Sequence, residues 1–126
     1  MTEHVTRNHA RLLTRVLERI FPNRAHRLEA LRILEQYGGS AAEPEAERVR
    51  LAILKLAGAD IAQLRSGVLG AKEDYEDTLS WAESPLDTEA RIGNRKLNPD
   101  QWAEIAAQDQ KQYEDWLHGH ELRDDR

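Results

Sequence analysis

Apolar residues recur along most of the chain at intervals of three and four, which is the spacing of one face of an α-helix. No segment alternates apolar and polar residues over the length of a strand. Proline and glycine interrupt the helical pattern and mark where one helix ends and the next begins. The pattern predicts helices over about residues 5–21, 24–37, 44–57, 61–83 and 99–118. We therefore expect an all-α fold, a compact bundle of four to five helices.

The third and fourth predicted helices form the centre of this bundle. Apolar residues lie almost all round the segment 44–57, as in a helix buried on every side. The segment 61–83 is the longest, and its apolar stripe suits packing against another helix. Gly67 and Gly70 interrupt that segment, which suggests that a second helix approaches closely there. We expect residues 48–85 to form a long central antiparallel helix pair.

The last third of the chain is predicted as a linker followed by an edge helix. Residues 84–98 are polar and contain turn-forming residues, which is typical of a linker. Asn98 and Pro99 suit the cap and first turn of a helix over 99–118. Apolar residues are sparse in that helix, so we place it at the edge of a single helical domain spanning residues 1–118. Residues 119–126 are expected to form a flexible tail.

Composition narrows the class of protein. The chain has 126 residues, with 18 Lys and Arg against 23 Asp and Glu, a net charge of −5 and no cysteine. The lack of cysteine excludes disulfides and thiolate metal sites. No apolar run reaches the length of a membrane span, and we expect a cytoplasmic protein of bacterial type. Residues 1–36 carry a net +3 and residues 73–126 a net −9. The basic segment either packs against the acidic one or meets an anionic partner.

A row of arginines gives one alternative function. Arg7, Arg11, Arg15 and Arg19 recur every four residues, so they share one side of the first predicted helix. Such a row can neutralise phosphates and bind an anion or a nucleic acid. No aromatic residue lies between the arginines to stack on a base. The competing interpretation is a solvated helix face that pairs with the acidic half of the chain.

Carboxylates give a second alternative, a metal-dependent enzyme. Four of them lie together near the middle of the fourth predicted helix: Glu73, Asp74, Glu76 and Asp77. Such a site needs further ligands from other helices, and no Glu-x-x-His motif is present. A looser group near the end of the chain suits adventitious metal binding: Asp115, His118, His120 and Glu121. With no phosphate loop, dinucleotide motif or nucleophile elbow, we predict no catalytic residue, cofactor or dedicated metal site.

A five-residue pattern occurs twice in the chain. Tyr-Glu-Asp-x-Leu spans residues 75–79 and recurs at residues 113–117. The repeat is either a coincidence between two acidic helices or the mark of a duplicated surface. Aromatic residues, Trp and Tyr above all, are enriched at protein contacts. We therefore expect a non-enzymatic protein–protein interaction or accessory module, with a homodimer as one form of it. The predicted contact residues are Tyr75, Trp81, Asp74 and Asp77.

A family resemblance rests on two stretches of the central segment. The first is Arg-Val-Arg-Leu-Ala-Ile-Leu-Lys-Leu-Ala-Gly-Ala-Asp, residues 48–60, and the second is the acidic and aromatic stretch 72–85, which ends in Ser-Pro. Together they resemble a small family of uncharacterised bacterial helical proteins over residues 48–85. Gly67 and Gly70 depart from that family's pattern. The resemblance implies a shared helical unit with Tyr75 and Trp81 in its signature, and it implies no activity.

Overall fold

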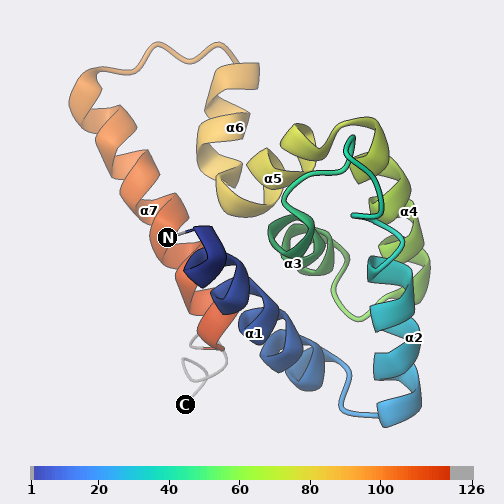
Figure 1. The fold of residues 1–126 in the computed structure, drawn as a ribbon. Helices are drawn as coiled ribbons and strands as arrows, with labels where there is room; N and C mark the ends of the chain where they lie inside the picture. The colour runs from blue at the N-terminus through green and yellow to red at the C-terminus, as the bar shows by residue number, and fades with distance from the viewer. Residues whose placement is uncertain (1, 120–126) are drawn as a thin grey trace.

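The computed structural model describes the backbone of residues 2–119 and the side chains from residue 9 onward. This part of the chain contains seven helices and no strand, which confirms the predicted all-α class (Figure 1). The helices are α1 (Thr2–Ile20), α2 (Arg24–Leu34), α3 (Ala46–Ala57), α4 (Ile61–Glu73), α5 (Tyr75–Glu83), α6 (Pro85–Ile92) and α7 (Pro99–His118). None of the helices described is long and apolar enough to cross a membrane.

Local capping explains where several helices begin. The Asn23 side chain accepts the backbone N–H of His26 at the start of α2. At the start of α7, the Asn98 side chain accepts the N–H of Gln101, whose own side chain accepts the N–H of Asn98. This reciprocal pair satisfies two amides that the helix cannot bond internally. The predicted helix over 99–118 is confirmed to the residue.

The prediction of one helix over 61–83 is wrong. Asp74 leaves the helical conformation, with φ −156° and ψ 84°, and separates α4 from α5. Its carboxylate accepts the N–H of Asp77 at 3.0 Å and so caps the start of α5. An aspartate stabilises a helix more at the N-cap than in the interior, because its short side chain accepts hydrogen bonds from nearby backbone amides. The apolar spacing carries on past this break, which is why periodicity alone missed it.

The prediction of a linker over 84–98 is also wrong, because α6 occupies residues 85–92. Pro85 stands in the first turn of α6, a position that lacks an internal hydrogen bond in any case. Ser84 precedes it without a side-chain cap, and the cap comes instead from Asp109 on α7. The described chain therefore has seven helices rather than four to five. Only residues 93–98 connect α6 to α7 without helix.

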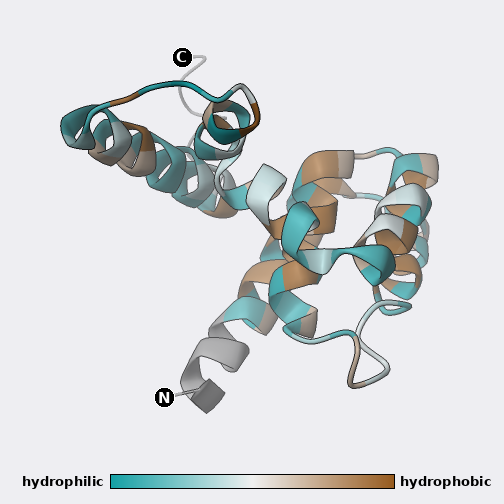
Figure 2. Ribbon diagram, turned by 90° about the horizontal axis from the view of Figure 1, so that it is seen from above, coloured by the Kyte–Doolittle hydropathy of each residue, from teal (hydrophilic) through white to brown (hydrophobic). Residues whose placement is uncertain are grey.

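The core lies around α3, as its apolar composition predicts. This helix packs against α1, α2, α4 and α5. Its most buried side chains have no exposed surface: Val49, Leu51, Ala52 and Leu54. Figure 2 shows the apolar residues concentrated in the central helices around α3, while α7 is mostly polar. α7 packs against α1, α5 and α6, so α6 and α7 form a hairpin on one side of the core.

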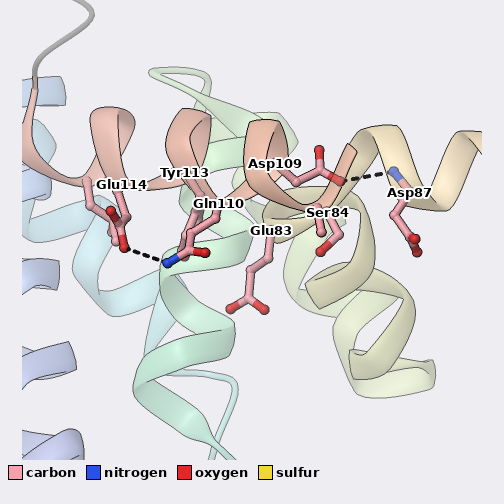
Figure 3. Close-up of a pocket in the computed structure, with 9 residues that line it drawn as sticks. Glu83, Ser84, Asp87, Asp109, Gln110, Tyr113 and Glu114 are labelled. Carbon is pink, nitrogen blue, oxygen red and sulfur yellow. Dashed lines mark hydrogen bonds between the residues drawn. The ribbon is translucent and has the colours of Figure 1, made fainter. Parts of the chain in front are cut away.

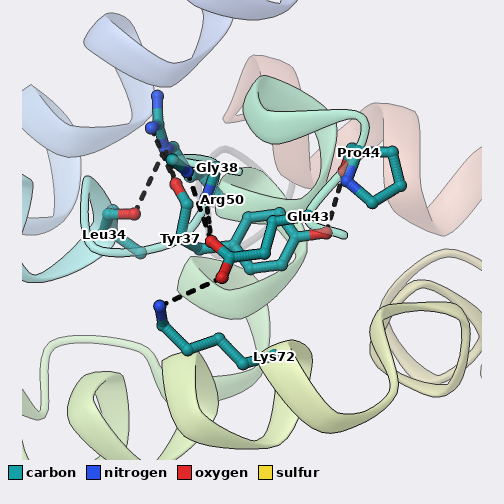
Figure 4. A network of polar contacts seen from close by, with 8 residues as sticks. Leu34, Tyr37, Gly38, Glu43, Pro44, Arg50 and Lys72 are labelled. Carbon is teal, nitrogen blue, oxygen red and sulfur yellow. Dashed lines mark hydrogen bonds and ion pairs between the residues drawn. The ribbon is translucent and has the colours of Figure 1, made fainter. Parts of the chain in front are cut away.

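The turn between α2 and α3 is fastened to the core by polar contacts (Figure 4). The Tyr37 hydroxyl donates to the Pro44 carbonyl at 2.8 Å, and the Tyr37 carbonyl accepts from Arg50. The Glu43 carboxylate accepts the N–H groups of Gly38 and Gly39 and pairs with Lys72 of α4 at 3.2 Å. These contacts satisfy backbone groups at the end of α2, which finishes at Leu34 rather than at residue 37.

The two glycines of α4 should respond in opposite ways to alanine. A Cβ on Gly67 would lie 2.8 Å from the Ile53 side chain of α3, so the predicted close approach is confirmed there. A Cβ on Gly70 would meet nothing within 4 Å, so the prediction is wrong at that residue. We expect Gly70→Ala to stabilise the protein by about 0.5–1 kcal/mol, because alanine favours the helix. Gly67→Ala should instead destabilise it by about 1 kcal/mol, because Ile53 is branched and stiff. Urea unfolding of both variants checks this, and the same sign for both would contradict it.

Candidate functional site

Two adjoining hollows run across the surface where α5 meets α3, α6 and α7, and we call them together the acidic groove. Figure 3 shows residues that line the first of them. The first, of about 430 Å³, lies between α5, α6 and α7. The second, of about 340 Å³, lies between α3 and α5. Glu83 and Ser84 line both. Six carboxylates line the groove against a single arginine, Arg48: Glu45, Glu76, Glu83, Asp87, Asp109 and Glu114.

The one arginine of the groove is already paired. Arg48 of α3 forms a two-pronged ion pair with Glu83 of α5, with Nε to Oε2 at 2.8 Å and Nη2 to Oε1 at 2.6 Å. It also pairs with Glu45 at 3.3 Å. The hydrogen bonds with Glu83 raise the pKa of Arg48 further above its usual range, so it remains a cation. Because its charge is balanced within the groove, the remaining carboxylates give the surface a net negative charge.

Two tyrosines line the groove, one in each hollow. Tyr113 of α7 is half-buried and stacks on Trp116 with ring centroids 5.8 Å apart. Burial, followed by the negative charge of Glu83, raises the pKa of Tyr113 above its usual value. Its phenol therefore stays protonated at neutral pH. Tyr75 of α5 is half-buried and packs against the core. The groove thus offers carboxylate acceptors and phenol groups to a ligand, which suits recognition of cations and hydrogen-bond donors.

The repeated five-residue pattern maps onto this groove. Tyr75, Glu76 and Leu79 of the first copy line the hollow between α3 and α5. The matching three residues of the second copy line the hollow beside α7: Tyr113, Glu114 and Leu117. The aspartate of each copy lies outside both linings, and in the second copy Asp115 pairs with Lys111 at 2.7 Å. The same three residue types therefore line both halves of one surface.

Asp109 holds the α6–α7 side of the groove in place. It is 2% exposed, the only charged or polar residue among the buried residues described. Its two carboxylate oxygens accept the N–H groups of Leu86 and Asp87, each at 3.0 Å (Figure 3 shows the second). These amides belong to the first turn of α6, where the helix dipole favours a negative charge. Asp109 therefore has a structural task and is not available to a ligand.

The predicted contact residues lie on different parts of this surface. Tyr75 lines the groove, while Asp74 caps α5 and Asp77 is exposed beside it. Trp81 is half-buried and lies about 120° round α5 from Tyr75, since each residue advances a helix by about 100°. The two aromatic side chains therefore do not form one continuous patch.

The predicted arginine row divides into different environments. The Arg19 guanidinium donates to the carbonyl oxygens of Trp116 and Leu117 at the end of α7. Arg11 and Arg15 are exposed and line a separate hollow of about 370 Å³ with Leu12 and His118. Arg7 lies outside the residues whose side chains the structure describes. The basic helix thus meets the C-terminal helix through backbone carbonyls.

The carboxylates of the predicted metal alternative do not converge. Glu73, Asp74, Glu76 and Asp77 are all exposed at the corner between α4 and α5. Across the described residues, no three His, Asp or Glu side chains gather as they would around a metal ion. His120 and Glu121 of the looser group lie outside the described residues. The structure thus brings no observation in favour of a metal-dependent enzyme.

Several groove residues were missed by sequence reasoning. Glu83, Arg48 and Glu45 look like ordinary surface charges in the sequence, and only the packing of α3 on α5 brings them together. Asp109 carried a usable signal, because it stands four residues from both Ile105 and Tyr113, on the apolar side of α7. A charge at such a position needs a buried partner.

No protein-family model, curated protein or solved structure matches the chain. The resemblance over residues 48–85 therefore stays a prediction.

Proposed function

We propose that this protein is a non-enzymatic interaction module that binds a basic segment of a partner protein in the acidic groove. The observation that carries the proposal is the placement of the repeat, because both copies supply a tyrosine, a glutamate and a leucine to one surface. A segment that alternates basic and apolar residues can meet both halves of such a surface in the same way. The predicted antiparallel pairing of residues 48–85 belongs to this proposal as the scaffold that carries α5.

The chemistry of the groove supports binding rather than turnover. Its arginine is balanced by Glu83 and Glu45, and burial raises the pKa of Tyr113 further above neutral pH, which makes this phenol a poor proton donor for catalysis. The carboxylates that remain at the rim, Glu76 and Glu114, are exposed and attract lysine or arginine side chains. Leu117 is half-buried and provides apolar surface beside Glu114, while Leu79 lines the other hollow as a core residue that is only 8% exposed. Self-association through Tyr75 and Trp81 stays a separate prediction.

The proposal predicts that the two glutamates of the repeat govern binding. The probe is a short synthetic helical peptide with lysines on one face and leucines on the other, titrated by calorimetry at low salt. We expect the wild type to bind and the double variant Glu76→Gln, Glu114→Gln to bind about tenfold more weakly, since each rim charge contributes about 0.5–1 kcal/mol. Binding should also weaken as salt is added.

The neighbouring aspartates provide a matched control. The double variant Asp77→Asn, Asp115→Asn removes the same two charges from the same two helices, one position further along, outside the groove lining. We expect it to bind the peptide within about twofold of the wild type, because screened charges beyond the contact contribute little. Equal weakening in both double variants would mean that net charge alone attracts the peptide. That result, or no binding by the wild type, would overturn the proposal.

A further inference from the structure

The arginine row on α1 serves two different purposes. Arg19 donates to the last carbonyls of α7, and its guanidinium lies over the Trp116 ring at 5.8 Å from the centroid. These carbonyls are the groups that a helix end leaves without internal partners. Arg19 also lies against Gly119, where an added Cβ would be 3.2 Å from its Nη1. Arg19 therefore fastens the end of α7 onto α1.

This fastening brings His118 beside the next two arginines of the row. Arg11, Leu12 and Arg15 of α1 and His118 of α7 line a hollow of about 370 Å³. Arg11 and Arg15 stand one helical turn apart, and both are exposed. Neither forms a hydrogen bond or ion pair with another residue whose side chain the structure describes, and no carboxylate is among the described residues that line the hollow. The hollow is thus a basic counterpart of the acidic groove.

We propose that this hollow binds the phosphomonoester group of a small molecule. Two guanidinium groups one turn apart can each direct paired N–H donors at phosphate oxygens. Leu12 offers apolar surface to the rest of the ligand, and His118 of α7 lines the hollow from the opposite helix. The site is independent of the acidic groove and of the function proposed for it.

A small ligand fits these observations better than a nucleic-acid strand. The charge available to a ligand comes from Arg11 and Arg15, because Arg19 is bonded to α7. No aromatic residue is among the described residues that line the hollow, so none of these can stack on a base. The chain carries a net charge of −5, which repels a long polyanion outside the hollow. A single phosphate group needs only the two arginines.

The test follows the His118 ring by NMR while inorganic phosphate is added at constant ionic strength, with the full chain. We expect saturable shifts of the ring resonances with phosphate and none with chloride. The double variant Arg11→Gln, Arg15→Gln should bind phosphate at least tenfold more weakly, since it loses charge-assisted hydrogen bonds from both guanidinium groups. Both side chains are exposed, and an unchanged thermal unfolding curve will show that the variant folds.

Two arginines on α2 provide the matched control. The double variant Arg24→Gln, Arg32→Gln removes the same charge from exposed positions and should keep the phosphate affinity of the wild type. Equal loss in both double variants would overturn the site, as would the absence of saturable shifts in the wild type. A lipid headgroup carries the same chemistry, so vesicles with and without phosphatidic acid form a second arm. Binding to those vesicles without binding to free phosphate would overturn the small-molecule assignment.

Discussion

Replacing Asp109 with alanine should destabilise the protein by about 2–4 kcal/mol, because two charge-assisted hydrogen bonds are lost and two α6 amides lose their acceptor. The carboxylate is 2% exposed, so water cannot take its place without opening the contact between α6 and α7. The amides of Leu86 and Asp87 donate directly to its two oxygens. Hydrogen exchange of these two amides should accelerate in the variant, and urea unfolding gives the loss of stability.

Ser84 provides the control for this prediction. It occupies the position before Pro85 where a serine side chain usually caps a helix, yet it makes no such bond. Replacing an N-cap serine with alanine usually costs about 1 kcal/mol of stability. We expect Ser84→Ala to cost less than about 0.5 kcal/mol, because Asp109 supplies the cap of α6. A larger loss for Ser84→Ala than for Asp109→Ala would mean that α6 depends on its own sequence rather than on α7.

The same contact explains where sequence reasoning about the fold succeeded and where it failed. Helices with a clear apolar stripe and a local cap, such as 24–34 and 99–118, were predicted within a few residues of their true ends. α6 was missed because it has eight residues, too few to be stable alone, and because its cap comes from a residue 22 positions further along. No local rule contains that information.

The break at Asp74 was missed for the opposite reason, because the evidence for it was local. An aspartate followed by acidic residues in the next turn is a helix start. The apolar stripe continues across it through Ala71, Tyr75 and Leu79, all of which face the core. The apolar periodicity therefore predicted one helix over residues 61–83, although the cap at Asp74 divides this segment into two helices. Sequence reasoning predicted Tyr75 as a contact residue, and the structure places it in the lining of the acidic groove. Glu83 and Arg48 are 35 positions apart and meet only through the packing of α3 on α5.

The largest loss of stability is expected at Tyr37, the bulkiest of the fully buried side chains, with 0% exposure. Tyr37→Ala should cost about 3–5 kcal/mol, as for other large aromatic side chains removed from a core. Tyr37→Phe keeps the ring and loses only the hydrogen bond to the Pro44 carbonyl, so it should cost about 1 kcal/mol. Urea unfolding of the two variants separates the packing of the ring from the bond of its hydroxyl. Similar losses in both would contradict this division.

The pH dependence of stability tests the same burial without changing the ring. Burial, followed by the negative charge of Glu43, raises the pKa of Tyr37 from 10.0 to about 12. Between these two pKa values the phenol is deprotonated in the unfolded state but still protonated in the folded state. Rising pH therefore lowers the free energy of the unfolded state, and the stability of the fold decreases. The fall attributable to Tyr37 approaches 1.4 kcal/mol per pH unit. Tyr37→Phe lacks this group but keeps Tyr113. The wild-type advantage of about 1 kcal/mol should therefore shrink above about pH 10 and reverse before about pH 12. An advantage that stays constant over that range would show that the Tyr37 phenol reaches solvent in the folded protein.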